Sequence, residues 1–455
     1  MRHILTEGVA MKRISALLLL ATLASANAAT IAVIDSGLDY KHEMIVPNLW
    51  TNANETMDNR DEDGNGYQDD VHGWNFAEQN AQIIDYKYLG TFSPDCKKYF
   101  DIQGKYFLKQ ATEAEIAWMK AKVAEPAFIK EMGKFGNFVH GTHVAGITIR
   151  GTHNNVMGIK LIPTEVKLIY IGLEKAAREN LVIDRWALLQ TAFDALAGEQ
   201  MKMLADIARF AAFHKADVAN GSFGTSFKAA KIITDNAYKI LFFKAPSAED
   251  SDKAAGMFIS ALIKAGSSFV NAAPNTLFVF AAGNDGMSND LYGASPANIK
   301  ADNVITVGAT YKNEFFAPFS NFGSKMVEVA APGMLIHSAI PGNDYLQVSG
   351  TSQASPYVAN VAARIKDANP SLRPADMKKI LMGTVDKKSF LVEKISTEGI
   401  VNPERATIAA ELSKTVSIDE AISRARTQVR DMAVTKSEGP VNKNIIPMPL
   451  TPMFR

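Results

Sequence analysis

Short apolar runs alternate with longer amphipathic stretches over most of the chain. The runs are about four to eight residues long and rich in Val, Ile, Ala and Phe, which is typical of strands that are covered on both faces. They predict strands over residues 30–35, 166–171, 216–220, 276–282, 303–310 and 326–331. Apolar residues that recur every three or four positions predict helices over 181–214, 228–243, 252–269 and 353–367. Because strands and helices alternate, we expect an α/β fold with a mostly parallel central sheet that is flanked by helices.

The longest apolar run lies near the start of the chain. Lys12 and Arg13 precede an apolar stretch over 14–24, and the small-residue sequence Ala-Asn-Ala follows at 26–28. This pattern is typical of a secretory signal peptide, and its apolar part is shorter than the ~20 residues of a membrane span. We therefore expect residues 1–28, starting at Met1 or at Met11, to direct export to the periplasm or the medium, with no stable membrane anchor.

The rest of the chain is expected to form one folded domain over 29–425 and a polar, proline-containing tail over 426–455. Three segments lengthen the connections between the predicted elements of this domain, at 75–138, 176–213 and 226–270. The first of these segments is rich in Lys, Tyr and Phe, and its aromatic residues predict a small satellite core.

The amino-acid composition excludes several kinds of binding partner and metal site. The 455 residues include 48 basic and 48 acidic side chains, so the chain has no excess charge for wrapping a nucleic acid. Cys96 is the single cysteine, which excludes an intramolecular disulfide and any zinc or iron–sulfur site built from several cysteines. We expect a soluble monomer that binds no nucleic acid.

Three motifs at the ends of predicted elements carry the side chains of a serine nucleophile system. Asp35 ends the first strand, and His140 opens the sequence HGTHVAG, whose small residues allow the start of a helix to pack close to the sheet. Ser352 lies in SGTSQASP just before the predicted helix 353–367, where free N–H groups and the positive end of the helix stabilise negative charge. A hydroxyl becomes nucleophilic when an imidazole takes its proton, and a buried carboxylate orients that imidazole.

A fourth motif, AAGN, follows the predicted strand that ends at residue 282. Its Asn284 places a side-chain amide at the carboxyl end of the strand. We expect this amide to donate to a developing oxyanion, opposite the backbone N–H of Ser352.

These motifs, in this order, resemble those of the subtilisin-like serine peptidases, the subtilases. The resemblance extends over most of residues 30–405 and includes NGSFG, FSNFG, AAPG, SAIPG and GIVN, which begin at residues 220, 319, 330, 338 and 399. It implies a three-layer subtilisin-like fold and an exported serine endopeptidase that acts on proteins or peptides without a catalytic cofactor. The implied triad is Asp35, His140 and Ser352, with Asn284 in the oxyanion hole. The implied substrate-binding residues are Ser222, Phe223, Gly224, Ala281, Ala282 and Gly283.

The chain departs from the family pattern close to the nucleophile. Gln353 stands where the family usually has Met, Tyr357 where it often has His, and Asn360 where Gly is common. None of these side chains holds a catalytic proton, so we expect changed packing with unchanged chemistry. One or two residues separate the predicted cleavage site from the first strand, where we expect no room for the propeptide that many secreted subtilases carry.

Residues 59–70 read NRDEDGNGYQDD, a spacing that predicts a calcium loop. Clustered carboxylates repel one another without a counter-charge, and Ca²⁺ takes six to eight oxygen ligands around a turn that contains glycine. Several subtilases carry a similar stretch after the catalytic Asp. We expect a structural Ca²⁺ ion, with an acidic turn that binds no ion as the alternative. Gly64 would form the turn, and the ligands would be Asn59, Asp61, Asp63, Asn65 and Asp70.

Two other functions stay open at this point. His140 and His143 with a carboxylate suggest a metal-dependent hydrolase, although the glutamate of the zinc-peptidase helix motif is missing and we expect His143 to be packed in the interior. A non-catalytic subtilase-like scaffold is the second alternative, and the intact set of Asp35, His140, Asn284 and Ser352 argues against it. We expect the remaining histidines at the surface or in supporting positions, among them His42, His72, His153 and His214.

Overall fold

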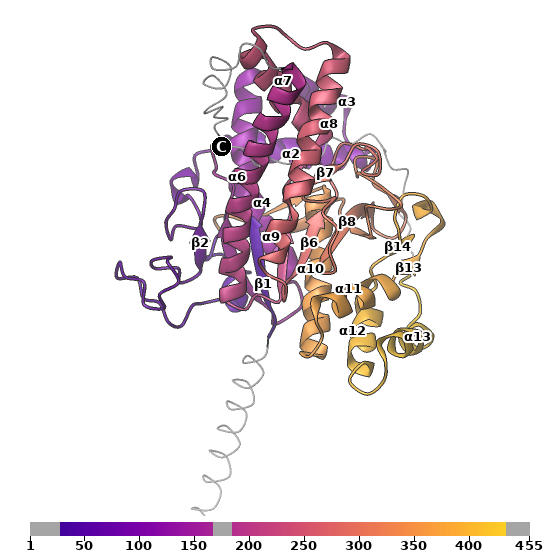
Figure 1. Cartoon of the computed structure of the whole chain (residues 1–455). Coiled ribbons are helices and arrows are strands. Elements are labelled where there is room, and N and C mark those ends of the chain that lie inside the picture. Colours follow the sequence, from indigo (N-terminus) through magenta and orange to yellow (C-terminus); the bar gives the residue numbers. More distant parts are fainter. Residues whose placement is uncertain (1–27, 167–183, 434–455) are drawn as a thin grey trace, which may run out of the picture.

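A sheet of ten strands forms the centre of the part of the chain that the structure describes (Figure 1). The structure is a computed structural model, and it describes residues 28–166 and 184–433. The strands are β1 (Thr30–Asp35), β2 (Gly73–Asn75), β3 (Asn155–Lys160), β4 (Val218–Gly221), β6 (Leu277–Ala281), β8 (Val304–Tyr311), β9 (Phe315–Phe316), β10 (Val329–Pro332), β13 (Asp386–Lys387) and β14 (Gly399–Ile400). Eight of them run parallel in the order β2–β3–β1–β4–β6–β8–β10–β14, while β13 and β9 pair antiparallel with β14 and β8.

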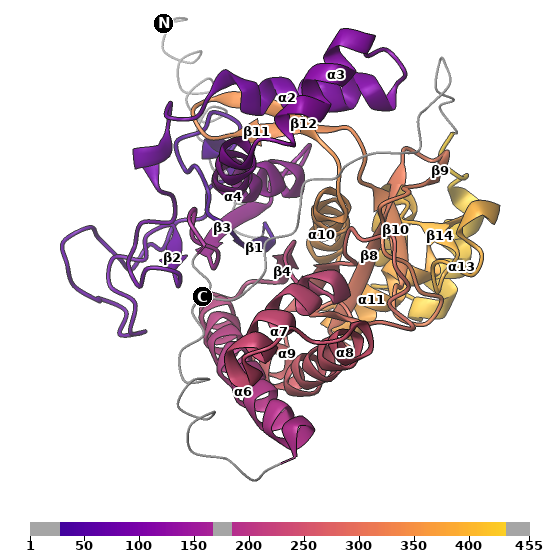
Figure 2. The same cartoon turned by 90° about the horizontal axis from the view of Figure 1, so that it is seen from above.

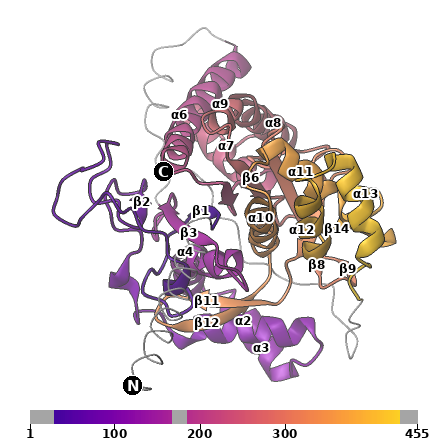
Figure 3. The same ribbon diagram turned by 90° about the horizontal axis from the view of Figure 1, so that it is seen from below.

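Helices cover both faces of this sheet (Figures 2 and 3). One face carries α4 (Pro126–Thr148), α10 (Thr351–Ala368), α11 (Pro374–Gly383) and α12 (Pro403–Leu412), with α13 (Ile418–Gln428) packed outside them. The other face carries α6 (Arg185–Phe213), α7 (Phe227–Phe242), α8 (Ala248–Ala265) and α9 (Ser267–Asn271). The three layers with a mostly parallel sheet confirm the fold class expected from the sequence.

Strand β1 explains why the apolar runs are continuous. Its side chains alternate between the two faces, so Ile31 and Val33 pack in the core beneath α4 and α10. Ala32 and Ile34 pack in the core beneath α6 to α9. A strand that lies between two cores has no face left for polar residues, and all six residues of β1 are buried.

Most predicted elements lie within a few residues of the observed ones, but one central strand was not predicted. β3 pairs with β1 over its whole length, in the register Thr30 with Asn155 to Asp35 with Lys160. The prediction had instead placed a strand at 166–171, and only residue 166 of that range is described. β3 escapes a search for apolar runs because it contains Gly158 and ends in Lys160. Its glycine allows close packing, since a methyl group there would lie 2.8 Å from the Cδ1 atom of Ile83 and this side chain would have to move.

The segment 75–138 contains a separate aromatic core. Helices α2 (Pro94–Phe107) and α3 (Glu113–Lys122) pack with the first half of α4 and with the antiparallel hairpin of β11 (Ile336–Ile340) and β12 (Asp344–Val348). The core includes Cys96, Tyr99, Phe100, Phe128, Phe135 and Phe138. The satellite core was therefore predicted correctly. The segment does not end at an element boundary, however, because α4 already begins at Pro126.

The two ends of the chain are only partly described. The predicted signal peptide lies outside the described residues except for residue 28, and so does the chain beyond residue 433. Helix α13 extends to Gln428, slightly into the predicted tail. Among the helices of the described residues, none is long and apolar enough to cross a membrane.

Candidate active site

A short hydrogen bond joins Asp35 to His140. The Asp35 Oδ1 atom lies 2.7 Å from His140 Nδ1 and also accepts the backbone N–H of Ser36 at 2.7 Å. Asp35 is fully buried at the carboxyl end of β1, while His140 is partly exposed on α4. A carboxylate that accepts the Nδ1–H bond holds the imidazole in the tautomer whose Nε2 atom is free to accept a proton.

Glycines bring α4 close enough to β1 for this contact. A methyl group on Gly141 would lie 2.1 Å from the carbonyl oxygen of Gly37, a distance at which no side chain fits. Two further hydrogen bonds cross the contact, from Gly141 N to Ser36 Oγ at 3.1 Å and from Asp39 N to Thr142 Oγ1 at 2.9 Å. The small residues after His140 were thus interpreted correctly, but His140 lies inside α4 and not at its start.

Ser352 occupies the first turn of α10 and is 2% exposed. Its Oγ donates to the carbonyl oxygen of Ser222 at 3.2 Å, and Ser222 Oγ donates in return to the carbonyl oxygen of Ser352 at 3.0 Å. Among the hydrogen bonds of residues 28–166 and 184–433, none joins Ser352 to His140. The structure therefore brings the candidate nucleophile to the predicted substrate strand and leaves its hydroxyl turned toward that strand.

Helix α4, which carries His140, packs against helix α10, which carries Ser352. Asn360 of α10 donates its Nδ2–H to the carbonyl oxygen of Thr148 at the end of α4, at 2.8 Å. Thr148 follows His140 by about two turns, and Asn360 follows Ser352 by about two turns, which is a rise of about 12 Å in each helix. This bond joins the two helices at equal distances along each helix from His140 and from Ser352. The bond also shows what Asn360 does in place of the usual glycine.

Asn284 follows β6 and has one end of its side-chain amide held in place. Its Oδ1 accepts hydrogen bonds from Thr351 N at 2.8 Å and from Thr351 Oγ1 at 3.0 Å. These two donors determine which end of the amide is the oxygen. The Nδ2 atom at the other end is buried and has no partner. A buried N–H donor that is fixed in direction and unused is suited to an oxyanion.

The predicted substrate-binding residues follow two neighbouring parallel strands. Ser222, Phe223 and Gly224 come after β4, while Ala282 and Gly283 come after β6, and Gly221 is in register with Phe280. Beyond Gly224, β5 (Thr225–Ser226) pairs antiparallel with β7 (Ala294–Ser295). Phe223 is 1% exposed and packs in the core beneath α6 to α9, so its backbone and not its ring is available to a peptide.

His143 lies one turn beyond His140 and has a structural role. It is fully buried, and its Nε2 lies 3.1 Å from the carbonyl oxygen of Ile336 and 3.0 Å from that of Leu346, so it donates to the hairpin of β11 and β12. Burial lowers the pKa of His143 to about 3. The Nε2 atom of His143 is therefore not available to a metal ion, and among the described residues neither His140 nor His143 belongs to a cluster of metal-ligating side chains, which argues against the metal-dependent hydrolase.

The acidic loop at 59–70 forms a cluster with residues that the sequence pattern did not include. Ligand atoms of Asp63, Asp70 and His214 lie within 4.8 Å of one another, and so do those of Glu55, Asp61 and Asp63. Asp70 is fully buried, and its Oδ2 lies 2.9 Å from His214 Nε2 at the end of α6.

Hydrogen bonds inside the loop hold these groups in place. Asn65 Nδ2 donates to Asp70 Oδ2 at 2.8 Å, and the carboxylate of Glu55 accepts backbone N–H groups of the loop. Burial raises the pKa of Glu55. Asn59 is exposed with a φ of 67°, and its backbone N–H donates to Asp69 Oδ1 at 3.0 Å. His214 was expected to be supporting, and no signal near the loop points to it because it comes from a distant helix.

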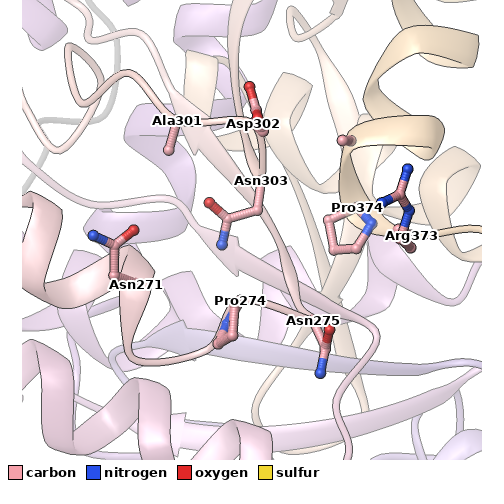
Figure 4. A pocket seen from close by; sticks show the side chains of 9 residues that line it. Asn271, Pro274, Asn275, Ala301, Asp302, Asn303, Arg373 and Pro374 are labelled. Atoms are coloured by element: carbon pink, nitrogen blue, oxygen red, sulfur yellow. The ribbon is translucent and has the colours of Figure 1, made fainter.

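A pocket of about 320 Å³ lies at the opposite edge of the sheet (Figure 4). Asn275 and Asn303 precede β6 and β8, so this pocket is at the amino ends of the strands. Asn303 donates its Nδ2–H groups to backbone carbonyl oxygens, with the nearest at 3.0 Å on Val270. The best-placed amide of the pocket is therefore already used by the fold.

Comparison with known proteins places the chain in a family. The family model described as "Subtilase family" matches residues 26–402. The chain is 38% identical over 135 residues to alkaline elastase YaB of Bacillus sp. (strain YaB), which covers 30% of this chain and 34% of that protein. It is 38% identical over 140 residues to subtilisin BL of Lederbergia lenta, with 30% and 49% covered. It is 27% identical over 395 residues to subtilisin-like protease 1 of Plasmodium vivax, with 84% and 48% covered.

The chain thus spans about a third to a half of the length of these curated relatives. The family match extends from before β1 to β14 and so includes every strand of the central sheet. It covers well over half of the chain, as the resemblance of the motifs implied. The chain therefore belongs to the subtilase family of subtilisin-like serine proteases.

Proposed function

We propose that the protein is a serine endopeptidase in which Ser352 attacks the scissile carbonyl carbon and His140 takes the proton from its hydroxyl. The bond of 2.7 Å between Asp35 and His140 carries this proposal. It fixes the imidazole with Nε2 as the acceptor, and the carboxylate stabilises the imidazolium ion that forms. His140 then returns the proton to the leaving amine, and a water molecule repeats the steps to release the acid product.

The nucleophile needs a small rotation before it reacts. The Ser352 hydroxyl donates to Ser222 in the free protein, and rotation about the Cα–Cβ bond of Ser352 turns the hydroxyl toward His140. The packing of α4 on α10 supports this step, because it holds together the two helices that carry His140 and Ser352. Bonds of this kind often tighten only when a substrate is bound.

Two N–H groups are proposed to stabilise the oxyanion. One is the backbone N–H of Ser352 in the first turn of α10, and the other is the unpartnered Nδ2 of Asn284. Thr351 holds the amide of Asn284 in the required direction before the substrate arrives. A donor that is already oriented costs no reorganisation in the transition state.

The substrate is proposed to be a protein or peptide in an extended conformation. It would add as a strand beside Ser222, Phe223 and Gly224, with Ala281, Ala282 and Gly283 on the other side of the residue before the cut. Small residues on that side leave room for a large substrate side chain. Strand addition holds a chain on both sides of the cut, which fits an endopeptidase.

Labelling with a serine-directed organophosphate tests this function. We expect one equivalent of the reagent on the wild type, located at Ser352 by mass spectrometry, and none on Ser352→Ala. Ser371→Ala, which removes an exposed serine outside the site, should keep full labelling and full peptide hydrolysis. A folded wild type that neither reacts nor cleaves peptides would instead indicate a binding scaffold.

We further propose that residues 1–28 direct export and are removed. The basic start, the apolar core and the sequence at 26–28 support this proposal. The amino terminus of the protein recovered outside the cytoplasm tests it, and a mature chain that still begins at Met1 would overturn it.

We also propose that the loop at 59–70 binds a structural Ca²⁺ ion. The donor set fits a hard cation, because the carboxylates of Glu55, Asp61 and Asp63 lie together and Asp63 also lies close to Asp70. Asn65 would add a carbonyl oxygen, while Asn59, which points its backbone to Asp69, would hold the turn. Bound calcium would cross-link the loop, and hydrolysis takes no step through it.

Thermal unfolding with and without calcium tests this site. Saturating Ca²⁺ should raise Tm by about 2–4 °C over the value in chelator, because a ligand that binds only the folded state stabilises it. Asp63→Asn should abolish the shift, while Asp302→Asn, an exposed control outside the loop, should keep it. Equal Tm values for the wild type in both conditions would contradict the proposal.

A further inference from the structure

Gln353 directly follows the proposed nucleophile in the sequence. Its side chain is buried, and its amide forms no hydrogen bond within the protein. The side chain is 1% exposed, and neither Nε2 nor Oε1 has a hydrogen-bond partner. A buried carboxamide without partners destabilises the folded state, because both polar ends lose their water and gain nothing. The residue is therefore not explained by packing, in contrast to Asn360 further along the same helix.

The amide of Gln353 borders the space where the oxyanion would form. A methyl group built on Gly350 would lie 2.8 Å from Gln353 Oε1, 3.5 Å from Asn284 Nδ2 and 3.6 Å from Ser352 N. One small region therefore touches the Gln353 amide and both proposed oxyanion donors. Gly350 has an extended backbone with φ of 173°, which any residue adopts, so the glycine serves to keep this region empty.

We propose that the carboxamide of Gln353 is a third donor to the oxyanion, beside Asn284 Nδ2 and the N–H of Ser352. The inference rests on the proposed function, since it needs the tetrahedral intermediate that Ser352 forms. Gln353 forms no covalent bond and transfers no proton. Its Nε2–H donates to the negative oxygen while the carbon–oxygen bond is single, and the contact weakens when the carbonyl forms again.

The amide of Gln353 can turn its donor end toward the oxyanion, because no hydrogen bond holds it. The amide of Asn284 is already held in its orientation by Thr351. Thr351 holds the oxygen end of the Asn284 amide and leaves the donor end without a partner, whereas no hydrogen bond holds either end of the Gln353 amide. A half-turn about the last side-chain bond exchanges Oε1 for Nε2 without changing the shape of the side chain. A negative oxygen selects the orientation that presents the donor.

Gln353→Met tests the inference, because methionine has a similar length and no donor. We expect kcat to fall about tenfold with KM unchanged, since the lost bond exists only in the transition state. A peptide aldehyde, which forms a tetrahedral adduct with the serine, should bind about tenfold more weakly. The affinity for an uncleaved peptide that forms no adduct should stay the same. Gln353→Leu is the second variant and should show the same pattern.

Gln200 on α6 provides a matched control. It is also buried, at 6% exposure, and both ends of its amide lack partners, but it packs on the opposite face of the sheet. Gln200→Met should leave kcat and the aldehyde affinity unchanged. The inference is overturned if the Gln353 variants keep wild-type kcat and aldehyde affinity, if KM absorbs the whole effect, or if Gln200→Met shows the same loss.

The organophosphate reaction separates this inference from the proposed function. A wild type that is labelled at Ser352, with Gln353 variants that are equally active, overturns only the role of Gln353. A wild type that is neither labelled nor active overturns the proposed function and the inference together.

Discussion

Replacing the buried His143 should change how the stability of the protein depends on pH. Burial lowers the pKa of this imidazole from 6.5 to about 3, so the folded protein keeps it neutral over a range in which the unfolded chain binds a proton. The unfolded state therefore binds more protons between these two values, and the free energy of unfolding falls as the pH falls through them. At about 1.36 kcal/mol per pH unit, the loss reaches roughly 4–5 kcal/mol near pH 3 and roughly 2–3 kcal/mol between pH 7 and pH 4.5.

Urea unfolding at a series of pH values measures this effect. The background is Ser352→Ala, which prevents self-digestion on the proposed mechanism. His143→Gln removes the titrating group and keeps an N–H donor for the carbonyl oxygens of Ile336 and Leu346. The other titrating groups are common to both proteins, so the difference in unfolding free energy isolates His143.

We expect the parent protein to lose roughly 2–3 kcal/mol relative to His143→Gln between pH 7 and pH 4.5. His153→Gln is the matched control, because this side chain is exposed, and it should show no such pH-dependent difference. A difference between the parent and His143→Gln that is constant over this range would refute the reasoning, since it would mean that the imidazole binds its proton equally well in both states.

Two further substitutions test the packing of the fold. Arg405 is 3% exposed and bonds to Asp386 at 2.8 Å and to several backbone carbonyl oxygens. Arg405→Leu should cost about 3–5 kcal/mol in urea unfolding, because it leaves the buried Asp386 carboxylate without a positive partner and with only its hydrogen bonds from Asn402 and Met432. A loss below 1 kcal/mol, which is the value typical of exposed ion pairs, would contradict this account. Gly141→Ala should lower kcat strongly by pushing α4 away from Gly37, whereas Gly133→Ala on an open part of the same helix should leave kcat unchanged. Equal activity of the two glycine variants would show that the close approach of α4 to β1 is not needed.

The sequence predicts those strands that can be recognised from the pattern of their own residues. Continuous apolar runs identified β1, β4, β6, β8 and β10, because each of these strands is covered on both faces. β3 was missed for a non-local reason, since its Lys160 is fully buried and bonds to Glu78 at 2.7 Å and to Asp85 at 2.9 Å. Those two carboxylates belong to the loop after β2, and no pattern within β3 indicates that they are there. In the sequence alone, a lysine argues against a buried strand, because its charge is rarely buried without a partner.

The candidate site follows the same division. Motifs predicted which residue types gather at the carboxyl edge, and the bond between Asp35 and His140 agrees with them. Motifs did not predict that the Asn284 amide is fixed at one end, that His214 reaches the acidic loop from α6, or that Glu55 joins the cluster. The first two facts depend on contacts between segments that are far apart in the sequence, whereas Glu55 is near the loop in sequence but outside its ligand pattern. The departure at Gln353 was visible in the sequence, but its meaning depends on the space beside Gly350.

Asp35, Asn284 and Gln353 of the proposed site are among the described residues that carry buried polar atoms without partners. Each such atom destabilises the folded protein, because it has left water without gaining a bond. Apolar burial around the central sheet offsets this loss of stability, since strands such as β1 are covered by apolar cores on both faces. The atoms stay unbonded in positions where a substrate oxygen or a changing charge can meet them. On the proposed mechanism, the polar groups that the reaction needs are therefore the same groups whose burial without partners lowers the stability of the folded protein.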